Sequence, residues 1–343
     1  MVRKTVTADG IADVRVVNGQ LSITGGFPQS PSKRVLPVTT SDVEHVFIPS
    51  RHGTISFEAM KWLKDVGINW TVLYDGEPTG HGYNNKSDAL LRRSQARAVD
   101  CEYGAEITRY LLTLKLAGQR DVASELSARA SREIGEQMDR LVPADLETCR
   151  KIEARAARTY FTAWSGRVAM KWDDPVPDAW RQFVSRESEI SPTKKRNATD
   201  PVNALLNYAY GVLEGKSVAA CYEMGLDPDM GILHADETYR PSMVCDLMEP
   251  GRPMVDRLIL DWTSSRSFKK REFMQSSESR TVRLTPPISK HVASLVSDAV
   301  YELYPYWEDV LDILVQHQSR WDKRGKKRRT PLSGDNYKAR YLQ

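Results

Sequence analysis

The sequence lacks the features by which several classes of protein are recognised. No apolar run approaches the roughly 18 residues that a membrane-spanning helix needs. No loop of the GxxxxGK[ST] kind is present to cradle nucleotide phosphates, and no Ser or Cys arrangement suggests a covalent enzyme intermediate. Cysteine is scarce, and the four that occur are scattered without a CxxC pair. We therefore expect reduced thiols, no thiolate metal site, no contact with a membrane and a cytoplasmic location.

A large excess of charge is also missing, because 49 Lys and Arg stand against 45 Asp and Glu, a net charge of +4. Positive charge is nevertheless concentrated at one end. Residues 320–343 hold nine Lys or Arg and two Asp, which is +7 and leaves residues 1–319 at −3. Smaller basic clusters lie at Lys194–Arg196 and Lys269–Arg271. On charge alone, contact with a polyanion and a merely solubilising surface both stay open.

The first 85 residues have the pattern of β-strands. An Asn18-Gly19 turn lies between two β-type runs, Val14–Val17 and Leu21–Ile23, which is a strong signal for a β-hairpin. Two further runs, Glu44–Ile48 and Asn69–Tyr74, are also rich in residues that favour strands.

A short helix and a loop complete this N-terminal part. The stretch Ser56–Asp65 predicts a helix with a broad apolar face, and Gly67 is placed to end it. Residues 75–85 are rich in Gly and Asn, which is typical of a loop and marks the boundary of the first domain.

After residue 87 the pattern becomes helical. Apolar residues recur at helical spacing from Ala89 through Leu116 and again from Val122 to Leu141. The length of 343 residues predicts about two domains. We predict an α+β protein with a small β-rich domain (residues 1–85), a larger all-α domain (residues 86–319) and a basic tail (residues 320–343).

One predicted helix carries a carboxylate where a core residue is expected. Within it, Glu153, Ala157, Tyr160 and Trp164 fall at i, i+4, i+7 and i+11, which is a single stripe. A buried carboxylate is costly unless it is paired or binds a metal. A Glu at the edge of the stripe that pairs with one of the arginines following it remains the alternative.

A second segment brings a histidine close to carboxylates. His234 ends a short apolar run, and Asp246 and Glu249 are three residues apart, so on a helix they share a face. A His with carboxylates suits a hard divalent cation that keeps positions open for phosphate oxygens. By spacing alone, a structural His and a solvated acidic pair are the favoured interpretation of this segment.

Four strings occur in one order in this sequence: Ile152–Phe161, Asp200–Tyr208, Gly231–His234 and Asp246–Pro253. Together they closely resemble the CRISPR-associated protein one family, the catalytic subunits of CRISPR spacer acquisition. The N-terminal part is similar too, through Gly53–Ser56 and the helix and strand that follow. The resemblance extends to about residue 315.

The resemblance implies a small β domain followed by a larger helical domain, which agrees with the prediction from periodicity. It implies that Glu153, His234 and Glu249 are the catalytic residues and the ligands of a Mg²⁺ or Mn²⁺ ion, supported by Asp246 and Asn203. The implied activity is that of a metal-dependent DNA endonuclease and integrase. The 3′-hydroxyl of a short DNA fragment displaces a strand of the CRISPR repeat by transesterification.

The resemblance also implies partners. These are double-stranded DNA, both as fragment precursor and as repeat, a second copy of the chain in a homodimer, and a small companion CRISPR-associated subunit that bridges two dimers. Candidates for contacts to DNA phosphates are Arg252, Arg257, Arg266, Lys269, Lys270 and Arg271. Three tryptophans could stack on splayed bases, although core packing is the favoured interpretation: Trp172, Trp180 and Trp262.

Two positions depart from the family pattern. Ala154 stands where the family usually has Gly, which favours a helix. Gly251 stands where an aromatic residue usually follows Glu-Pro, so we expect looser packing behind Glu249.

Two other functions stay open: a transposase-like integrase or branched-DNA nuclease outside a CRISPR locus, and a non-catalytic DNA-binding scaffold.

Overall fold

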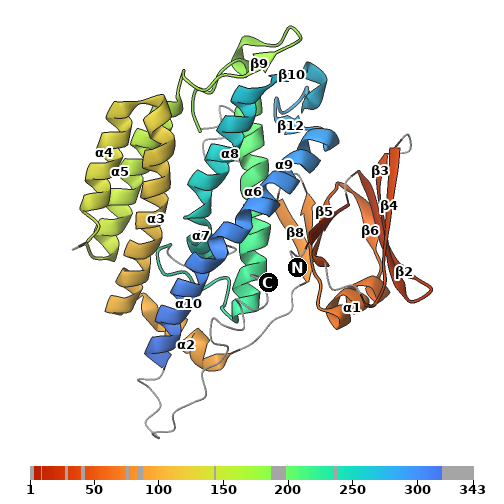
Figure 1. Cartoon of the computed structure of the whole chain (residues 1–343), viewed down its shortest axis with the longest axis horizontal. Helices are drawn as coiled ribbons and strands as arrows, with labels where there is room; N and C mark the ends of the chain where they lie inside the picture. Colours follow the sequence, from red (N-terminus) through yellow and green to blue (C-terminus); the bar gives the residue numbers. More distant parts are fainter. Residues whose placement is uncertain are drawn as a thin grey trace, which may run out of the picture.

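The chain is rich in strands at its N-terminal end and helical in the rest (Figure 1), which confirms the predicted α+β class. The computed structural model describes residues 4–8, 10–27, 30–39, 43–74, 77–82, 88–142, 144–186, 198–234, 238 and 240–318. The basic tail and the cluster at Lys194–Arg196 lie outside these residues. Among the described residues, no helix combines the length and the apolar character needed to cross a membrane.

Within the described residues, the N-terminal region holds two four-stranded sheets. One sheet has the order β1–β5–β7–β8, built from Lys4–Thr7, Val43–Pro49, Asn69–Tyr74 and Glu77–Gly82. The other has the order β4–β3–β2–β6, built from Ser30–Leu36, Gln20–Phe27, Ile11–Val17 and His52–Ile55. Strands β1, β5 and β7 run parallel, as do β2 and β6, and the other neighbours are antiparallel.

The predicted hairpin and helix are confirmed, and their end residues explain them. Asn18 and Gly19 both have positive φ, 51° and 75°, as a two-residue turn between β2 and β3 requires. Helix α1 (Phe57–Val66) begins at Ser56, whose side chain accepts a hydrogen bond from the N–H of Ala59 at 3.1 Å. It ends at Gly67, which has left-handed geometry with φ 82°.

The two sheets and α1 share one apolar core. Val14 and Leu21 from one sheet and Val46 from the other are fully buried in it. Trp62 of α1 donates from Nε1 to the carbonyl oxygen of Gly19 at 3.0 Å, which ties the helix to the hairpin turn.

The loop predicted from 75 to 85 is wrong in part, because its residues Glu77–Gly82 form β8 and pair with β7. The glycines that suggested a loop have a packing role. A Cβ atom at Gly82 would lie 2.2 Å from Nε1 of Trp70, so only glycine lets that ring lie across the strand.

Helices dominate the C-terminal region. They are α2 (Ala89–Ala98), α3 (Glu102–Leu126), α4 (Ala128–Asp139), α5 (Leu146–Trp164), α6 (Pro201–Met224), α7 (Ser242–Met248), α8 (Gly251–Ser265), α9 (Pro286–Ala299) and α10 (Tyr304–Gln318). The region is not purely helical, because short strands also pair: β9 (Lys171–Trp172) with β10 (Ser267–Phe268), and β11 (Phe273–Gln275) with β12 (Val282–Leu284).

The helical pattern that begins at Ala89 is divided between α2 and α3. A Cβ atom at Gly104 would lie 1.8 Å from the carbonyl oxygen of Ala98, so this glycine lets α3 begin directly against the end of α2. The next break comes at Ser127, whose side chain accepts from the N–H of Ala130 at 3.3 Å and begins α4.

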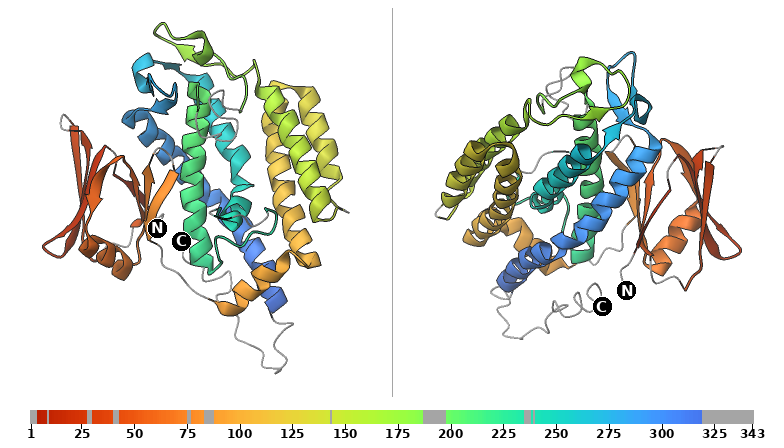
Figure 2. Two further views of the ribbon diagram at one scale, coloured as in Figure 1. Left: turned by 180° about the vertical axis from the view of Figure 1, so that it is seen from behind. Right: turned by 45° about the horizontal axis from the view of Figure 1, so that its top comes forward.

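Helix α6 runs through the middle of the helical region (Figure 2). Asp200 begins it by accepting from the N–H of Asn203 at 2.9 Å, and Gly225 ends it with φ 79°. Most of its residues are buried, because β8 packs on one side and α7, α8 and α9 pack on the others. A helix that is apolar all round is expected in such a position.

The N-terminal region is attached to α6 by buried polar contacts. Lys216 donates from Nζ to Oγ1 of Thr5 at 2.5 Å and lies 3.8 Å from Oε1 of Glu44. Asn69 of β7 donates to Oε1 of Glu223 at 2.6 Å. Burial lowers the pKa of Lys216, and the charge of Glu44 opposes that effect.

Candidate functional site

One cavity of about 690 Å³ is lined by all three residues predicted as ligands. Glu153 comes from α5, His234 from the segment after α6, and Glu249 from the junction of α7 and α8. Figure 1 shows α3 and α5 on one side of this part of the molecule and α8 and α6 on the other. The structure therefore brings together side chains that are far apart in the sequence.

His234 is held in place by Asp246, which is completely buried. The Asp246 carboxylate accepts hydrogen bonds from the backbone N–H groups of Ile232, Leu233 and His234 at 2.6, 3.0 and 3.0 Å. It also lies 2.6 Å from Nδ1 of His234. Because an ionised carboxylate only accepts, Nδ1 carries the proton and Nε2 is left with a lone pair.

Glu249 is 2% exposed and stays ionised because two cations surround it. Arg252 donates from Nε to its Oε1 at 2.8 Å, and Nζ of Lys115 lies 2.5 Å from its Oε2. Burial by itself raises the pKa of Glu249, but the charges of Lys115 and Arg252 outweigh burial and lower it to about 2. Nε2 of His234 is 4.0 Å from Oε1 of the same carboxylate.

Glu153 pairs with Lys115 of α3, and not with an arginine of its own helix as the alternative from sequence supposed. Nζ of Lys115 donates to its Oε1 at 2.5 Å. Burial would lower the pKa of Lys115, and the charges of Glu249 and Glu153 raise it instead. One buried ammonium thus holds two of the predicted ligands.

The donor set fits a hard divalent cation. Two carboxylates and an imidazole nitrogen are accepted by Mg²⁺ and Mn²⁺. Nε2 of His234 and Oε1 of Glu249 are 4.0 Å apart, so two of the three predicted ligands already lie near each other. Across the described ranges, however, no three His, Cys, Asp or Glu side chains are already drawn together as an ion site, since Glu153 and Glu249 close on Lys115 instead.

A third carboxyl group also lines the cavity, and no sequence pattern had indicated this residue. Asp256 is 1% exposed and accepts from the hydroxyl groups of Tyr160, at 3.0 Å, and Tyr210. Burial raises its pKa to about 6, although both hydroxyl groups act against that increase. The guanidinium groups of Arg186 and Arg252 lie over the Tyr210 ring, 5.5 and 5.3 Å from its centre.

Asn203 forms a hydrogen bond with Arg186, whereas the resemblance implied that it would support the predicted metal ligands. Its Oδ1 accepts from Arg186 at 2.6 Å, and its Nδ2 donates to the carbonyl of Ser185 at 2.7 Å and to Asp200 at 2.6 Å. Asn203 therefore positions a cation at the cavity wall.

Besides Arg252, which donates to Glu249, two more of the arginines predicted to bind DNA form hydrogen bonds within the protein. Arg257 of α8 donates to Glu125 and to the carbonyl of Asp121. Arg266 donates to both carboxylate oxygens of Glu272, at 2.6 and 2.8 Å. These contacts hold α8 and the turn that follows it, and DNA binding by Arg257 and Arg266 stays a prediction.

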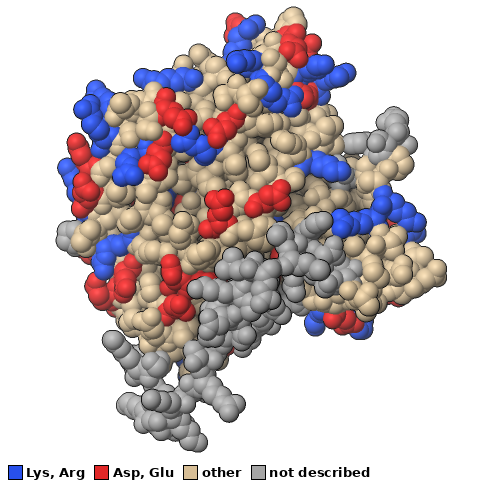
Figure 3. Space-filling model, in the orientation of Figure 1, with Lys and Arg blue, Asp and Glu red and all other residues tan. Residues whose placement is uncertain are grey.

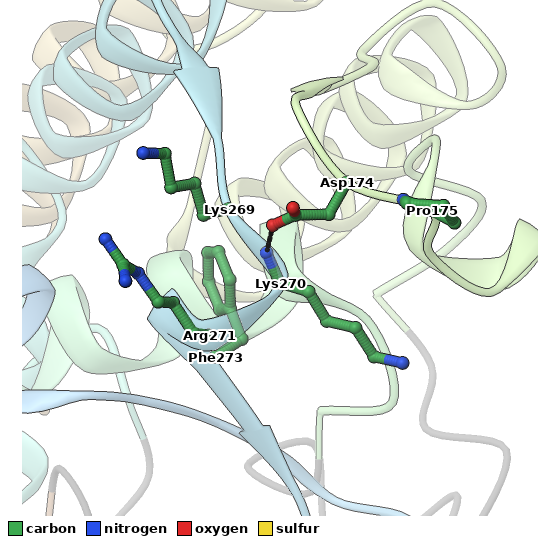
Figure 4. A pocket seen from close by; sticks show the side chains of 6 residues that line it. All are labelled: Asp174, Pro175, Lys269, Lys270, Arg271 and Phe273. Carbon is green, nitrogen blue, oxygen red and sulfur yellow. Dashed lines mark hydrogen bonds between the residues drawn. The ribbon is translucent and has the colours of Figure 1, made fainter.

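The other basic residues form an exposed turn after α8. Lys269, Lys270 and Arg271 line a surface pocket with Asp174 and Phe273, and Asp174 accepts from the backbone N–H of Lys270 at 2.8 Å. In Figure 4, Lys269 and Arg271 point to one side of this turn and Lys270 points to the other. Figure 3 shows Lys and Arg gathered at the end of the molecule where β9 and β10 lie, together with some acidic residues.

Trp180 belongs to the core, and Trp172 and Trp262 are half-buried and pack against it. Trp180 is 2% exposed and lies 5.7 Å from Trp172, measured between ring centres. Trp262 packs edge-on against Phe268 at 5.2 Å. Stacking on splayed bases therefore has no support from these contacts.

A sequence model of the family "CRISPR associated protein Cas1" matches residues 12–298. This chain belongs to the Cas1 family.

Curated relatives cover most of this Cas1 chain. The CRISPR-associated endonuclease Cas1 1 of Thermodesulfovibrio yellowstonii is 28% identical over 303 residues, which are 82% of each chain. The CRISPR-associated endonuclease Cas1 1 of Pyrobaculum aerophilum is 32% identical over 266 residues, which are 74% of this chain and 84% of its own.

Solved structures share the fold of this Cas1 chain. A casposase bound to integration product matches with TM-score 0.76 and 18% identity over 99% of this chain and 98% of its own. A Cas1 protein from Thermotoga maritima matches with TM-score 0.71 and 16% identity over 95% and 100% of the two chains. A chain of the Cas6-RT-Cas1–Cas2 complex matches with TM-score 0.72 and 16% identity over 95% of this chain and 36% of that chain.

The glycine that departs from the Cas1 pattern does not loosen the site, contrary to the expectation from sequence. Gly251 is buried, and a Cβ atom there would lie 2.7 Å from Leu303 and 2.9 Å from Leu213. Both leucines are themselves buried. They fill the space behind Glu249 that an aromatic side chain would take.

Sequence reasoning missed Lys115, although a signal was present. In α3, Ile107, Leu111, Lys115 and Gln119 recur every four residues and are all buried, so a lysine interrupts an apolar stripe as Glu153 does in α5. Two such interruptions on neighbouring helices predict an ion pair. For Asp256 and Arg186 the corresponding contacts come from residues far away in the sequence, and no local pattern indicates them.

Proposed function

We propose that this Cas1 protein is a CRISPR spacer integrase and endonuclease that joins short DNA fragments to a CRISPR repeat. The observation that carries the proposal is the convergence of Glu153, His234 and Glu249 on one cavity. The buried carboxylate of Asp246 supports it, because that group leaves Nε2 of His234 ready to bind a cation. The endonuclease names of the curated relatives agree with this chemistry.

Glu153, Glu249 and Nε2 of His234 would hold a Mg²⁺ or Mn²⁺ ion. When bound, such an ion stabilises the negative charge that develops on a scissile phosphate. Asp246 keeps the imidazole proton on Nδ1, and Arg252 keeps Glu249 ionised against the cavity wall.

The reaction exchanges one phosphodiester bond for another. The 3′-hydroxyl oxygen of the fragment attacks a phosphorus of the repeat, and its new bond forms as the bond to the repeat's 3′-oxygen breaks. The attacking hydroxyl gives up its proton and the released 3′-oxygen takes one up, so atoms and charge balance. Arg186 and Arg252, held over the Tyr210 ring, would contact the phosphate oxygens. With water as the nucleophile, the same residues would cleave DNA.

The turn Lys269–Arg271 would contact the DNA backbone away from the reacting phosphate. It follows the C-terminal end of α8, whereas Glu249 directly precedes the N-terminal end. A helix of 15 residues is about 22 Å long. That length corresponds to roughly six nucleotides at 3.4 Å each. These contacts would position the strand without reading its sequence.

Partners are proposed by analogy with the matched structures. One of them contains an integration product, and another is a complex of Cas1 with Cas2. We accordingly propose double-stranded DNA as substrate, a Cas2-type companion and a homodimer of this chain.

A strand-transfer assay tests the function. Purified protein with its companion receives a labelled duplex with free 3′-hydroxyls and a plasmid bearing the repeat, in Mn²⁺ or in EDTA. We expect metal-dependent joining at the repeat. Substituting a residue that only supports a metal ligand typically lowers activity by roughly 10–100-fold. Glu153→Gln and His234→Ala remove proposed ligands themselves, so we expect them to lower joining by more than that. Matched controls are Glu147→Gln, which is exposed on the same helix, and His291→Ala, also exposed; both should keep wild-type joining.

Other outcomes separate the alternatives. Joining without preference for the repeat would favour a transposase-like integrase, and cleavage of branched DNA without joining would favour a nuclease outside a CRISPR locus. If DNA binds but wild type and the two ligand variants behave alike, the protein is a DNA-binding scaffold and the ligand assignment is wrong.

A further inference from the structure

Lys115 lies where two of the predicted ligands meet. Its Nζ is 2.5 Å from Oε1 of Glu153 and 2.5 Å from Oε2 of Glu249. The Lys115 side chain is 6% exposed and that of Glu249 is 3% exposed, so water screens this contact little. The two carboxylates come from α5 and from the α7–α8 junction, and the ammonium of α3 joins them.

The ammonium and a divalent ion would compete for the same oxygens. Lys115 contacts one oxygen of each carboxylate, and the other oxygen of Glu249 is bonded to Arg252. Of these two carboxylates, only Glu249 approaches His234, at 4.0 Å, and the described residues hold no preformed group of three ligands. The ammonium of Lys115 is therefore the cation that joins Glu153 to Glu249.

The charges around the cavity set the balance of this competition. Its acidic lining residues are Glu153, Glu249 and Asp256, and its basic lining residues are Lys115, Arg158, Arg186 and Arg252. A divalent ion added next to the Lys115 ammonium would meet strong repulsion at short range. The lysine stem has four rotatable carbons and reaches a cavity of about 690 Å³, so the ammonium has space to move.

We propose that Lys115 is an internal counter-ion that holds Glu153 and Glu249 together until a divalent ion displaces it. Lys115 thereby weakens ion binding and determines how much free Mg²⁺ or Mn²⁺ the site requires. This inference rests on the proposed ion site. It adds that Lys115 binds Glu153 and Glu249 when the ion does not. In the protein without an ion, the same contact stabilises the packing of α3 against α5 and α8.

The test measures ion binding directly. EDTA-stripped full-length protein is titrated with Mn²⁺ alone in a calorimeter, and its thermal midpoint is measured with and without Mn²⁺. Lys115→Met keeps the length of the side chain and removes its charge, so we expect at least tenfold tighter Mn²⁺ binding. We also expect a lower midpoint in EDTA and a larger increase on adding Mn²⁺ than in wild type. Lys151→Met, an exposed lysine on α5 paired with Glu147, should leave the affinity unchanged.

Lys115→Arg provides a second comparison if the Met variant does not fold. A guanidinium binds two carboxylates in a planar fork, so we expect weaker Mn²⁺ binding than in wild type. The inference is overturned if Mn²⁺ binds wild type at a site that Glu249→Gln removes, yet Lys115→Met binds no tighter or Lys115→Arg no weaker. If wild type shows no Mn²⁺ site that depends on Glu249, both the inference and the proposed ion site are wrong.

Discussion

Asp256 shows how the surroundings of a single side chain set its charge. Its carboxyl group is buried and accepts two tyrosine hydroxyl bonds, with Arg186 and Arg252 as the nearby cations. Burial has the largest effect and raises the pKa from 3.8 to about 6. Deprotonation therefore costs more in the folded protein than in the unfolded chain.

The Asp256→Asn variant should reveal this cost as a pH dependence. Because the folded pKa exceeds the unfolded value, Asp256 contributes stability fully below about pH 4, and that contribution is lost as pH rises to about 6. The free energy of unfolding of wild type, minus that of Asp256→Asn, should fall by up to about 3 kcal/mol across this range. Urea unfolding at several pH values between 4 and 7.5 measures it. Asp261→Asn, exposed on the same helix, should give a constant difference, and a constant difference for Asp256→Asn would refute the assignment.

Individual site residues differed in how far sequence could predict them. The positions of Glu153, His234 and Glu249 could be predicted because short strings mark them. No such string marks Lys115. Its partners lie 38 and 134 positions away, and only folding brings them close. Arg257 shows that folding adds partners which the local sequence does not indicate, since Glu125 comes from a distant helix.

At the scale of elements, the N-terminal part of helix α8 forms one wall of the cavity. Gly251 begins this helix and packs against Leu213 of α6 and Leu303. Helix ends were well predicted where a capping residue is local, as at Ser56 and Gly67. Strand β8 was missed because pairing with β7 outweighs its loop-like composition.

Gly251→Phe tests the packing behind Glu249. The added ring would have to displace two buried leucines, so we expect the free energy of unfolding to fall by about 1–3 kcal/mol. Chemical denaturation measures the change. Ala154→Gly, at the other position that departs from the family, is exposed within α5 and should cost about 1 kcal/mol through helix propensity alone. A Gly251→Phe protein as stable as wild type would mean that an empty space exists there after all.

At the scale of the molecule, polar contacts fix the strand-rich region to the helical region. Lys216 and Glu44 are both buried where β5 approaches α6, and the hydroxyl of Tyr301 also donates to Glu44. Neither residue was indicated by sequence, because the two regions were treated as separate domains.

The Lys216–Glu44 contact should couple the two regions energetically. Lys216→Met alone leaves a buried carboxylate without its cation and should destabilise the protein by roughly 3 kcal/mol. Adding Glu44→Gln should recover part of that loss, with a coupling of about 1–3 kcal/mol in a double-mutant cycle followed by urea unfolding. The exposed Lys61–Asp65 pair is the matched control and should show a coupling below about 0.5 kcal/mol. Equal coupling in the two cycles would contradict a buried interaction.

The cavity also has a consequence for protein synthesis. Its wall takes residues from α3, α5, α6 and the start of α8, so the lining extends from Lys115 to Asp256. A nascent chain on the ribosome has completed α3 and α5 long before Glu249 is translated. Until α8 emerges and packs, Lys115 can neutralise only Glu153, and the proposed ligand set is incomplete. A product truncated before Glu249 would lack one of the proposed ligands and part of the cavity wall, so we expect it to join no DNA.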